Sequence, residues 1–347
     1  MQYLGCQWME HGLSFELNDV YDCCMSHHGD LGMPIIFKNY KGEFVDWDEV
    51  FEIKEKRIAS QKNETIPECK GCIFLKDKHV ENERYICDIA FQQIKLCNAK
   101  CVYCGDDFRN NPNYYDVYPI IKNLVDKGYF KPCGLVVFQG GEPTLMRDFD
   151  KLTELFTEQN SLVKVNTSAI KYSPAIYKGI KKGKVFVVVS IDSGTSEMYK
   201  KIKRVDAFDK VKNNISKYQN ADKYNEFPSV VLKYIITPGY NDSVQDVDDW
   251  LNLVDELGIK SIAVDVENKY ANLNNQSEVS PHVLYLIDYI FYCAEKSNIK
   301  VEQYCFAEYV SNARKVPKCE KLLKNKPLLV KVVDNLRERN KGKNYTY

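Results

Sequence analysis

Three cysteines stand close together in the first third of the chain. They form the segment Cys97-Asn-Ala-Lys-Cys101-Val-Tyr-Cys104, in which three residues and then two separate the thiols. Three thiolates in one tight loop can bind a four-iron cube and leave one iron open to a chelating small molecule. The alternative is a structural zinc or ferredoxin-type site, in which Cys87 or Cys133 supplies a fourth ligand.

The bulk composition narrows the class of protein. Lys plus Arg and Asp plus Glu each total 48, so charge does not indicate a nucleic-acid or membrane partner. Nine of the 13 cysteines fall at or before Cys104, and no apolar segment reaches the roughly 20 residues that span a bilayer. The N-terminus lacks the basic and apolar regions of an export signal, so we expect a cytoplasmic protein with reduced thiols that bind metal.

Short β-rich segments alternate with helical patterns from about residue 85 onward. The expected strands are residues 86–92, 134–138, 163–166, 185–191, 230–236 and 261–264. The expected helices are residues 115–127, 148–157, 174–182, 209–218, 243–257 and 281–296, with Ser243 and Ser280 as N-caps and Gly128 and Gly258 as helix ends. This alternation predicts an α/β fold, a partial (β/α)6 TIM-like barrel, with a flat doubly wound sheet as the alternative.

The chain divides into three expected regions. Residues 1–84 are rich in Cys and poor in periodic apolar residues, apart from a helix near 46–59, so they form a small metal-binding extension. Residues 85–300 form the barrel. Residues 301–347 form a C-terminal strand and helix extension, with the helix near 328–339.

Polar motifs follow the second, third and fourth expected strands. The first is Gln139-Gly-Gly-Glu-Pro-Thr144, in which two glycines let the backbone approach a ligand and Glu142 can accept a hydrogen bond from an ammonium group. The others are Asn166-Thr-Ser168 and Ser190-Ile-Asp192. Because the carboxyl ends of barrel strands form the active face, these motifs are expected to lie together.

With these motifs in this order, the segment from Cys97 to about Asp265 resembles the core of the radical S-adenosylmethionine (SAM) superfamily. The resemblance implies a [4Fe–4S] cluster on the three loop cysteines, SAM at the open iron, and cleavage to a 5′-deoxyadenosyl radical that abstracts hydrogen from a substrate. It implies a small reductant protein such as flavodoxin or ferredoxin as partner. It assigns SAM binding to Tyr103, Gly140, Gly141, Glu142, Pro143, Asn166, Ser168, Ser190, Asp192 and Lys203. Either cation of Lys203-Arg204 could bind the SAM carboxylate, and no side chain is assigned a catalytic role.

The N-terminal cysteines suggest a second metal site. Cys69-Lys-Gly-Cys72 is a turn that can place two thiolates on one metal, and Cys6 with Cys23 or Cys24 can complete the ligand set. Their order resembles half of a SPASM or twitch domain, which implies an auxiliary [4Fe–4S] cluster, and zinc is the alternative. The remaining cysteines are expected in the core: Cys87, Cys133, Cys293, Cys305 and Cys319.

The sequence does not identify the substrate. The SPASM-like segment favours a peptide or protein, a sugar or nucleotide-sugar is the alternative, and a non-catalytic iron–sulfur or zinc protein is the competing class. The reaction class, oxidoreductase or transferase, stays open. The polar residues expected on the inner barrel wall are Lys233, Asp265, Glu267 and Tyr304.

Overall fold

A computed structural model of the chain describes residues 2–23, 35–42, 44–63, 66–69, 75–79, 83–104, 115–222, 228–267 and 280–302. The chain divides into two compact units. The first contains residues 1–98, 105–187 and 221–225, and the second contains residues 99–104, 188–220 and 226–347. Each unit is described by itself below.

The first unit is built on a sheet whose strand order is β8-β7-β6-β2-β3-β4. Four neighbouring strands are parallel: β2 (Gly12–Phe15), β6 (Asp88–Phe91), β7 (Leu135–Phe138) and β8 (Leu162–Thr167). The other two, β3 (Val20–Tyr21) and β4 (Ile35–Phe37), continue the sheet in antiparallel pairs.

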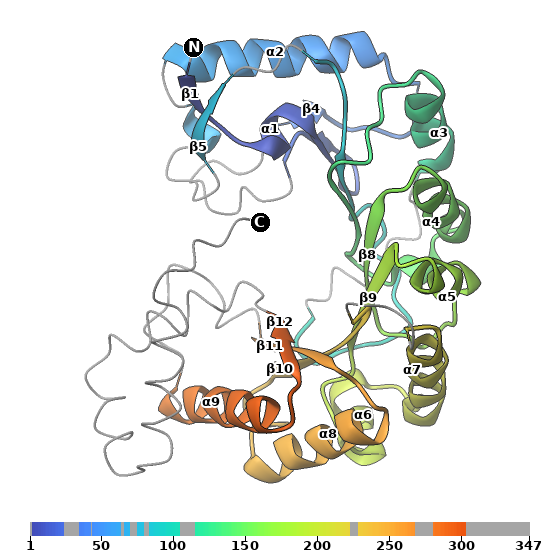
Figure 1. Ribbon diagram of the computed structural model, residues 1–347, viewed down its shortest axis with the longest axis vertical. Helices are drawn as coiled ribbons and strands as arrows, with labels where there is room; N and C mark the ends of the chain where they lie inside the picture. The colour runs from blue at the N-terminus through green and yellow to red at the C-terminus, as the bar shows by residue number, and fades with distance from the viewer. Residues whose placement is uncertain are drawn as a thin grey trace. The chain divides into compact units, whose positions relative to one another are not determined.

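Helices cover one face of the parallel strands. They are α3 (Tyr118–Asp126), α4 (Phe149–Glu158) and α5 (Pro174–Lys181), and all three lie on the same side of β8 (Figure 1). Along β8, Val163 and Val165 are fully buried, whereas Lys164 and Asn166 on the opposite face are only half-buried. Helices on a single face are typical of a barrel wall, because a doubly wound sheet carries helices on both faces.

The N-terminal residues of the first unit add a small layer beside this sheet. Strand β1 (Gln2–Gly5) pairs antiparallel with β5 (Lys76–His79). Helix α1 (Gln7–His11), helix α2 (Trp47–Asn63) and the short 3-10 helix η2 (Pro67–Cys69) complete it.

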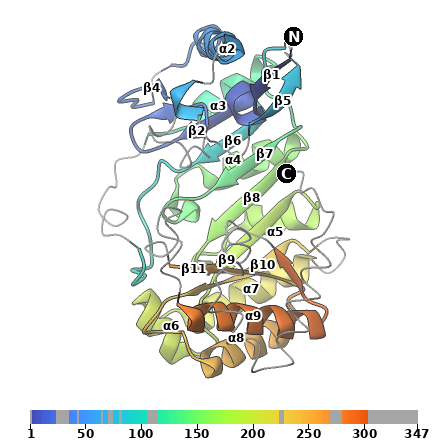
Figure 2. The ribbon, with the colours of Figure 1, turned by 90° about the vertical axis from the view of Figure 1, so that its left-hand side faces the viewer.

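The second unit repeats the strand–helix pattern. Its strand order is β12-β11-β10-β9, with β9 (Val185–Ser190), which enters from the first unit, β10 (Val230–Ile236), β11 (Ser261–Val266) and β12 (Lys300–Glu302). Its helices are α6 (Ser196–Lys203), α7 (Phe208–Asp222), α8 (Val244–Glu256) and α9 (Pro281–Lys296). The last two residues of α7 are assigned to the first unit. Figure 2 shows α8 and α9 on one side of β10 and β11. Val188, Val231 and Ala263 form one buried layer of the core.

The predicted α/β fold with a parallel sheet is confirmed. The strands predicted from residue 134 onward match β7 to β11, and β10 begins and ends at the predicted residues. Ser243 and Ser280 cap α8 and α9, and Gly128 and Gly258 follow helices with φ of 73° and 65°. These are left-handed values that favour glycine.

Two expectations were wrong. Residues before 85 were placed outside the sheet, yet β2 pairs parallel with β6 and brings β3 and β4 with it. Cys133 was expected in the core and is exposed, because it lies in the turn before β7. Cys87 is fully buried and Cys293 is half-buried. Cys305, Cys319 and the helix near 328–339 lie outside the described residues, and the region boundaries at 84 and 300 stay predictions.

Candidate functional site

The cysteine loop is fastened to helix α6 within the second unit. The amide of Lys100 donates to the carbonyl of Lys203 at 2.9 Å, and the amide of Val102 donates to the carbonyl of Ile202 at 2.9 Å. The amide of Cys104 donates to the carbonyl of Cys101 at 3.1 Å, which closes a turn between these two predicted ligands. Two backbone bonds and a turn therefore fix the loop before any side chain is considered.

The Cys101 thiol is chemically prepared to bind metal. A hydrogen bond with the Cys104 thiol lowers the pKa of Cys101 to about 6, burial opposes this shift, and the Lys203 ammonium assists it. Because the thiolate is the form that ligates metal, the lowered pKa favours Cys101 as a ligand. Among the described residues, which include Cys97, Cys101 and Cys104, no three potential ligands are grouped to hold a metal ion. Cys97, the third predicted ligand, is half-buried in the first unit.

Three side chains beside the loop form a buried hydrogen-bonded triad. The Tyr103 hydroxyl donates to Asp192 Oδ2 at 2.6 Å, and Lys203 Nζ donates to the Tyr103 hydroxyl at 2.6 Å. Lys203 also forms an ion pair with the same carboxylate. The Lys203 and Asp192 side chains are 2% and 0% exposed, so this pair is part of the interior and ties the cysteine loop to the end of β9.

Burial acts against the charged form of Lys203, but the nearby Asp192 carboxylate and Cys101 thiolate outweigh it. The pKa of the Lys203 ammonium therefore lies above its ordinary value. The second carboxylate oxygen of Asp192 accepts a hydrogen bond from the backbone amide of Ile235 at 2.8 Å. The side-chain amide of Asn241 donates to the backbone carbonyl of Asp192 at 2.8 Å. Asp192 has φ of 57°, a left-handed turn that these bonds hold in place.

Glu142 is the centre of a second buried network, in the first unit. Its side chain accepts from the amides of Thr144 (3.2 Å) and Ser168 (2.7 Å). It also accepts from the hydroxyls of Thr144 (2.6 Å), Thr167 (2.7 Å) and Ser168 (2.7 Å). None of the ion pairs found among the described residues involves Glu142, which is 1% exposed. Within the described part of the chain, the groups that donate to Glu142 are all neutral.

The two glycines before Glu142 pack against the chain that leads to Cys97. The amide of Gly141 donates to the carbonyl of Ile94 at 2.8 Å, and the amide of Glu142 donates to the carbonyl of Leu96 at 2.8 Å. A Cβ atom on Gly141 would lie 2.5 Å from the Leu96 carbonyl oxygen. Gly140 has φ of 97°. Glycine is therefore required here for close packing and for the turn itself.

The other predicted SAM residues lie at the expected strand ends. Asn166 and Ser190 are half-buried near the ends of β8 and β9, and Pro143 is buried in the 3-10 helix η4 (Pro143–Leu145). Arg204 is exposed at the C-terminal end of α6, whereas Lys203 is buried. Of the two candidate cations for the SAM carboxylate, Arg204 is the one whose side chain is not already paired with Asp192.

The predicted wall residues form an ion pair. Lys233 Nζ on β10 lies 2.8 Å from Asp265 Oδ2 on β11, and both side chains are partly exposed. Glu267 is buried. Tyr304 lies outside the described residues. Cys87, an alternative fourth ligand, lies at the amino end of β6, whereas the loop with Cys97 follows its carboxyl end, so Cys87 does not complete that ligand set.

Two of the predicted N-terminal ligands come together. Cys6 packs in a small buried cluster around Met9 and Cys69, and Cys6 Sγ accepts a hydrogen bond from the Met9 amide at 3.4 Å. Cys23 is also buried. Cys72 and Cys24 lie outside the described residues, and within the part of the chain that is described no group of three potential ligands is positioned to hold a metal ion.

Sequence reasoning missed several members of these networks. Thr167 and Asn241 support Glu142 and Asp192, and helix α6 with its Thr195 cap was not predicted. Thr195 as a cap, followed by apolar Met198, Tyr199 and Ile202 at helical spacing, was the available signal. Glu16 and Gln92, which follow β2 and β6, were also not predicted as a polar pair.

Comparison with known proteins agrees with this geometry. The sequence model of the Radical SAM superfamily matches residues 94–267, half of the chain, and this protein belongs to that superfamily. The GTP 3′,8-cyclase of Clostridium botulinum is 27% identical over 192 residues, which cover 53% of this chain and 56% of that enzyme. The chain thus spans little more than half the length of the relatives it matches.

Solved structures show the same fold. The crystal structure of Streptococcus suis SuiB has a TM-score of 0.51 and 16% sequence identity, covering 75% of this chain and 56% of SuiB. SuiB bound to S-adenosylmethionine has a TM-score of 0.50 and 17% identity, with coverage of 75% and 57%. These likenesses concern the fold, whereas membership of the Radical SAM superfamily rests on the sequence model, and that family implies an iron–sulfur cluster and SAM. Among the described residues, no helix is long and apolar enough to cross a membrane.

Proposed function

We propose that the chain uses a [4Fe–4S] cluster on Cys97, Cys101 and Cys104 to cleave SAM, and that its substrate is a peptide or protein. When bound, cluster and SAM supply a 5′-deoxyadenosyl radical that takes hydrogen from an unactivated C–H bond. The observation that carries this proposal is the geometry of the cysteine loop. The Lys100 and Val102 amides hydrogen-bond to α6, a turn joins Cys101 to Cys104, and the Cys104 thiol and the Lys203 ammonium lower the pKa of Cys101.

The protein's own residues would hold and orient the cofactors. Lys203 balances the negative charge of the loop, and Tyr103 links that loop to Asp192. Glu142, whose donors among the described residues are all neutral, would accept a hydrogen bond from the methionyl ammonium, with Gly140 and Gly141 allowing close approach. Contacts from Pro143, Asn166, Ser168 and Ser190 to SAM remain part of the proposal.

A second metal centre in residues 1–84 is also proposed. Cys6 and Cys69 are 63 positions apart in the sequence but pack against the same buried Met9. With Cys23 and Cys72 they would form a four-thiolate site for a [4Fe–4S] cluster, or for zinc in the alternative.

The substrate and partners follow from the same reasoning. The SPASM-like order of the N-terminal cysteines supports a peptide or protein, and a flavodoxin or ferredoxin would supply the electron. A low-potential cluster and reduced thiols suit the reducing cytoplasm. A nucleotide is the second candidate substrate, because relatives that match 53% of this chain are GTP 3′,8-cyclases.

The central test uses anaerobically reconstituted protein with dithionite and SAM, with 5′-deoxyadenosine as the measured product. We expect Cys97→Ala, Cys101→Ala and Cys104→Ala each to abolish it, because two thiolates hold the cube poorly. The matched control is Cys133→Ala, which removes an exposed thiol and leaves the product unchanged. Full product formation in any of the three loop variants would place the cluster elsewhere.

The second centre is tested in the variant that lacks all three loop cysteines. We expect it to retain about four irons if the N-terminal site is a cluster, or about one zinc if it is not. Metal analysis of the purified variant gives the answer. Retention of neither metal would show that these thiols are ordinary cysteines.

A further inference from the structure

A row of four polar residues crosses the parallel sheet of the first unit at the carboxyl ends of its strands. Phe15, Phe91, Phe138 and Val165 lie side by side in the strand register. The residues that follow them are Glu16, Gln92, Gln139 and Asn166. Since neighbouring strands are about 4.8 Å apart, these four side chains form a continuous line.

The row lies on the face of the sheet that the helices do not cover. Phe15 stacks on Phe91 (5.5 Å between ring centroids), Phe91 stacks on Phe138 (4.7 Å), and Phe138 meets Phe149 of α4 (5.0 Å). These aromatic side chains therefore point toward α4. Because successive side chains alternate between faces, the next residue on each strand points the other way.

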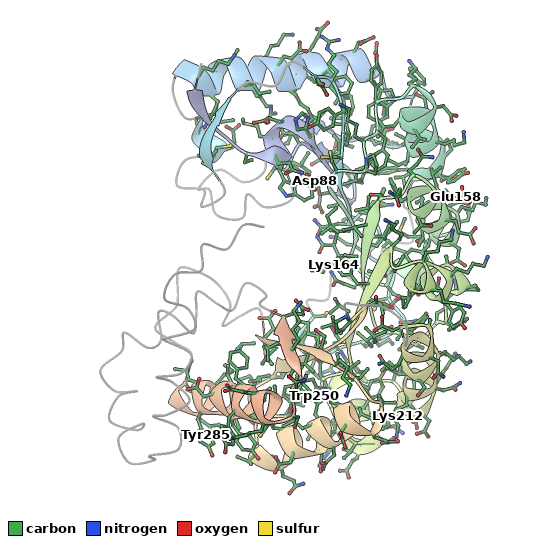
Figure 3. The ribbon with its side chains drawn as sticks, in the orientation of Figure 1. Asp88, Glu158, Lys164, Lys212, Trp250 and Tyr285 are labelled. Atoms are coloured by element: carbon green, nitrogen blue, oxygen red, sulfur yellow. The ribbon has the colours of Figure 1, made fainter. Side chains whose placement is uncertain are left out.

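Hydrogen bonds confirm that the members of the row face one another. Gln92 Nε2 donates to Glu16 Oε1 at 2.7 Å, and Asn166 Nδ2 lies 3.4 Å from Gln139 Oε1. All four side chains are half-buried. Figure 3 shows Lys164, two residues before Asn166, on the side of β8 away from Glu158 at the end of α4.

Glu16 is the acidic member of this row. Burial raises its pKa to about 7, while the Ser14 hydroxyl and the charge of Lys95 oppose the shift and the charge of Asp19 adds to it. Burial, a hydrogen bond with Asp19 and the charges of Asp19 and Glu16 raise the pKa of the nearby Tyr21 hydroxyl to about 12, so Tyr21 stays neutral where Glu16 titrates. Near neutral pH the Glu16 side chain therefore exists in both protonation states, unlike an ordinary surface glutamate.

We propose that this row is the substrate-binding surface of the enzyme and that Glu16, on a strand preceding the radical SAM core, contacts a peptide group of the substrate. Gln and Asn side chains carry the same donor and acceptor pair as a peptide bond, and the Glu16 carboxylate accepts a hydrogen bond from an N–H. The proposal rests on the proposed function, because it takes the substrate to be a peptide.

The position of the row supports this assignment. Gln139, the third member of the row, directly precedes Gly140 and Gly141, and Asn166 at the end of the row is itself a proposed SAM contact, so this end of the row borders the proposed SAM site. Glu16 is two strands further along, about 10 Å away, which is the length of about three extended residues. A peptide bound along the row would reach from the SAM turn to Glu16.

The test uses reconstituted enzyme, SAM and dithionite with two probes. One is a tryptic digest of perdeuterated protein, and the other is a perdeuterated mixture of sugars and nucleotides, both in ordinary water. The readout is the fraction of 5′-deoxyadenosine that carries deuterium, which reports hydrogen abstraction from the probe independently of the total SAM cleaved.

With the peptide probe, we expect deuterium transfer in the wild type and at least a tenfold lower fraction in Glu16→Gln, because a hydrogen bond to a charged group is lost. Transfer should rise as pH passes through about 7 in the wild type, as Glu16 ionises, and should not follow pH in this way in Glu16→Gln. The control Glu158→Gln, on exposed α4 surface, should behave as the wild type. If Glu16→Gln does not fold, Gln92→Met tests the row by removing only the amide.

Wild-type transfer and pH dependence in Glu16→Gln would overturn the proposal. So would deuterium from the sugar and nucleotide probe alone, or 5′-deoxyadenosine that carries deuterium from neither probe. The absence of 5′-deoxyadenosine from every variant is a different result, because it contradicts the proposed SAM cleavage itself.

Discussion

Glu142 and Asp192 are both carboxylates at strand ends and are almost fully buried, at 1% and 0% exposure. Their charges are stabilised in opposite ways. Asp192 is paired with the Lys203 ammonium and bonded to Tyr103, so its charge is balanced within the fold. Glu142 is surrounded by amides and hydroxyls that carry no charge.

These two ways of stabilising a buried carboxylate suit two different roles, a structural role and a ligand-binding role, which a sequence motif cannot distinguish. A balanced carboxylate stabilises the structure around it, because neither charge can be removed without leaving the other buried and unpaired. A carboxylate held only by neutral donors keeps a negative charge that a bound cation can neutralise. Asp192 therefore belongs to the scaffold of the cysteine loop, and Glu142 is the residue suited to the ammonium group of a ligand.

The largest expected effect comes from Lys203→Met, which leaves the Asp192 carboxylate unpaired. We expect it to destabilise the protein by about 3–5 kcal/mol. Denaturant unfolding measures this. The matched control is Lys201→Met on the same helix, where solvent screens the exposed ion pair with Glu197 and the loss should be far smaller. The double variant Lys203→Met with Asp192→Asn should recover most of the loss, and no recovery would mean that the pair is not coupled.

Glu142→Gln should have the next largest effect. We expect it to lower SAM affinity more than the stability of the fold. The substitution removes the negative charge. Each carboxylate oxygen of Glu142 accepts a hydrogen bond from one backbone N–H, so the side-chain NH2 group of the introduced glutamine must face one of these two donors. We expect SAM affinity to fall by about tenfold or more while iron content is unchanged. Equilibrium SAM binding and iron analysis measure both. Loss of iron with normal affinity would reverse the roles of the two carboxylates.

Tyr103→Phe removes the hydroxyl that bridges Asp192 and Lys203 but keeps their ion pair. The expected loss of unfolding free energy is about 1–2 kcal/mol, smaller than for Lys203→Met. Thermal unfolding of Tyr103→Phe and Lys203→Met under the same conditions shows which variant loses more stability. An equal loss in both would show that the hydroxyl, and not the ion pair, holds the network together.

The smallest effect concerns the pH response of the metal-free loop. With a pKa of about 6, Cys101 should react with iodoacetamide at nearly its full rate by pH 7. In Lys203→Met the nearby positive charge is gone, so the pKa should rise and labelling at pH 6–7 should slow. Residue-resolved mass spectrometry follows the reaction. An unchanged pH profile would exclude Lys203 as a cause of the lowered pKa.

Local patterns predicted most of the strands and helices after residue 130. Ser243 and Ser280 cap helices as expected, since capping depends on residues three positions apart. A strand at Gly12 could be expected from the sequence, but its parallel pairing with β6 was missed, because the residues of β2 do not show which strand they pair with. Burial on both faces is a property of the assembled sheet.

The sequence predicted the parts of the candidate site that consist of short motifs, but not the contacts between them and other elements. The spacing of the residues was enough to predict the cysteine loop and the glycine turn. It did not predict that the cysteine loop hydrogen-bonds to α6, or that the glycine turn hydrogen-bonds to residues 94–96. Lys203 was assigned to SAM, whereas its ammonium is paired with Asp192. That pairing depends on the left-handed backbone at Asp192 and on the length of α6, which spacing alone does not reveal.

The position of β2 has a consequence for any attempt to study the barrel alone. Because β2 lies between β6 and β3, removing the residues before 85 would leave β6 as an open edge strand. Ile89 and Phe91 on that strand are fully buried in the intact chain. Open, apolar edges pair with other chains, so such a truncated protein should aggregate during expression.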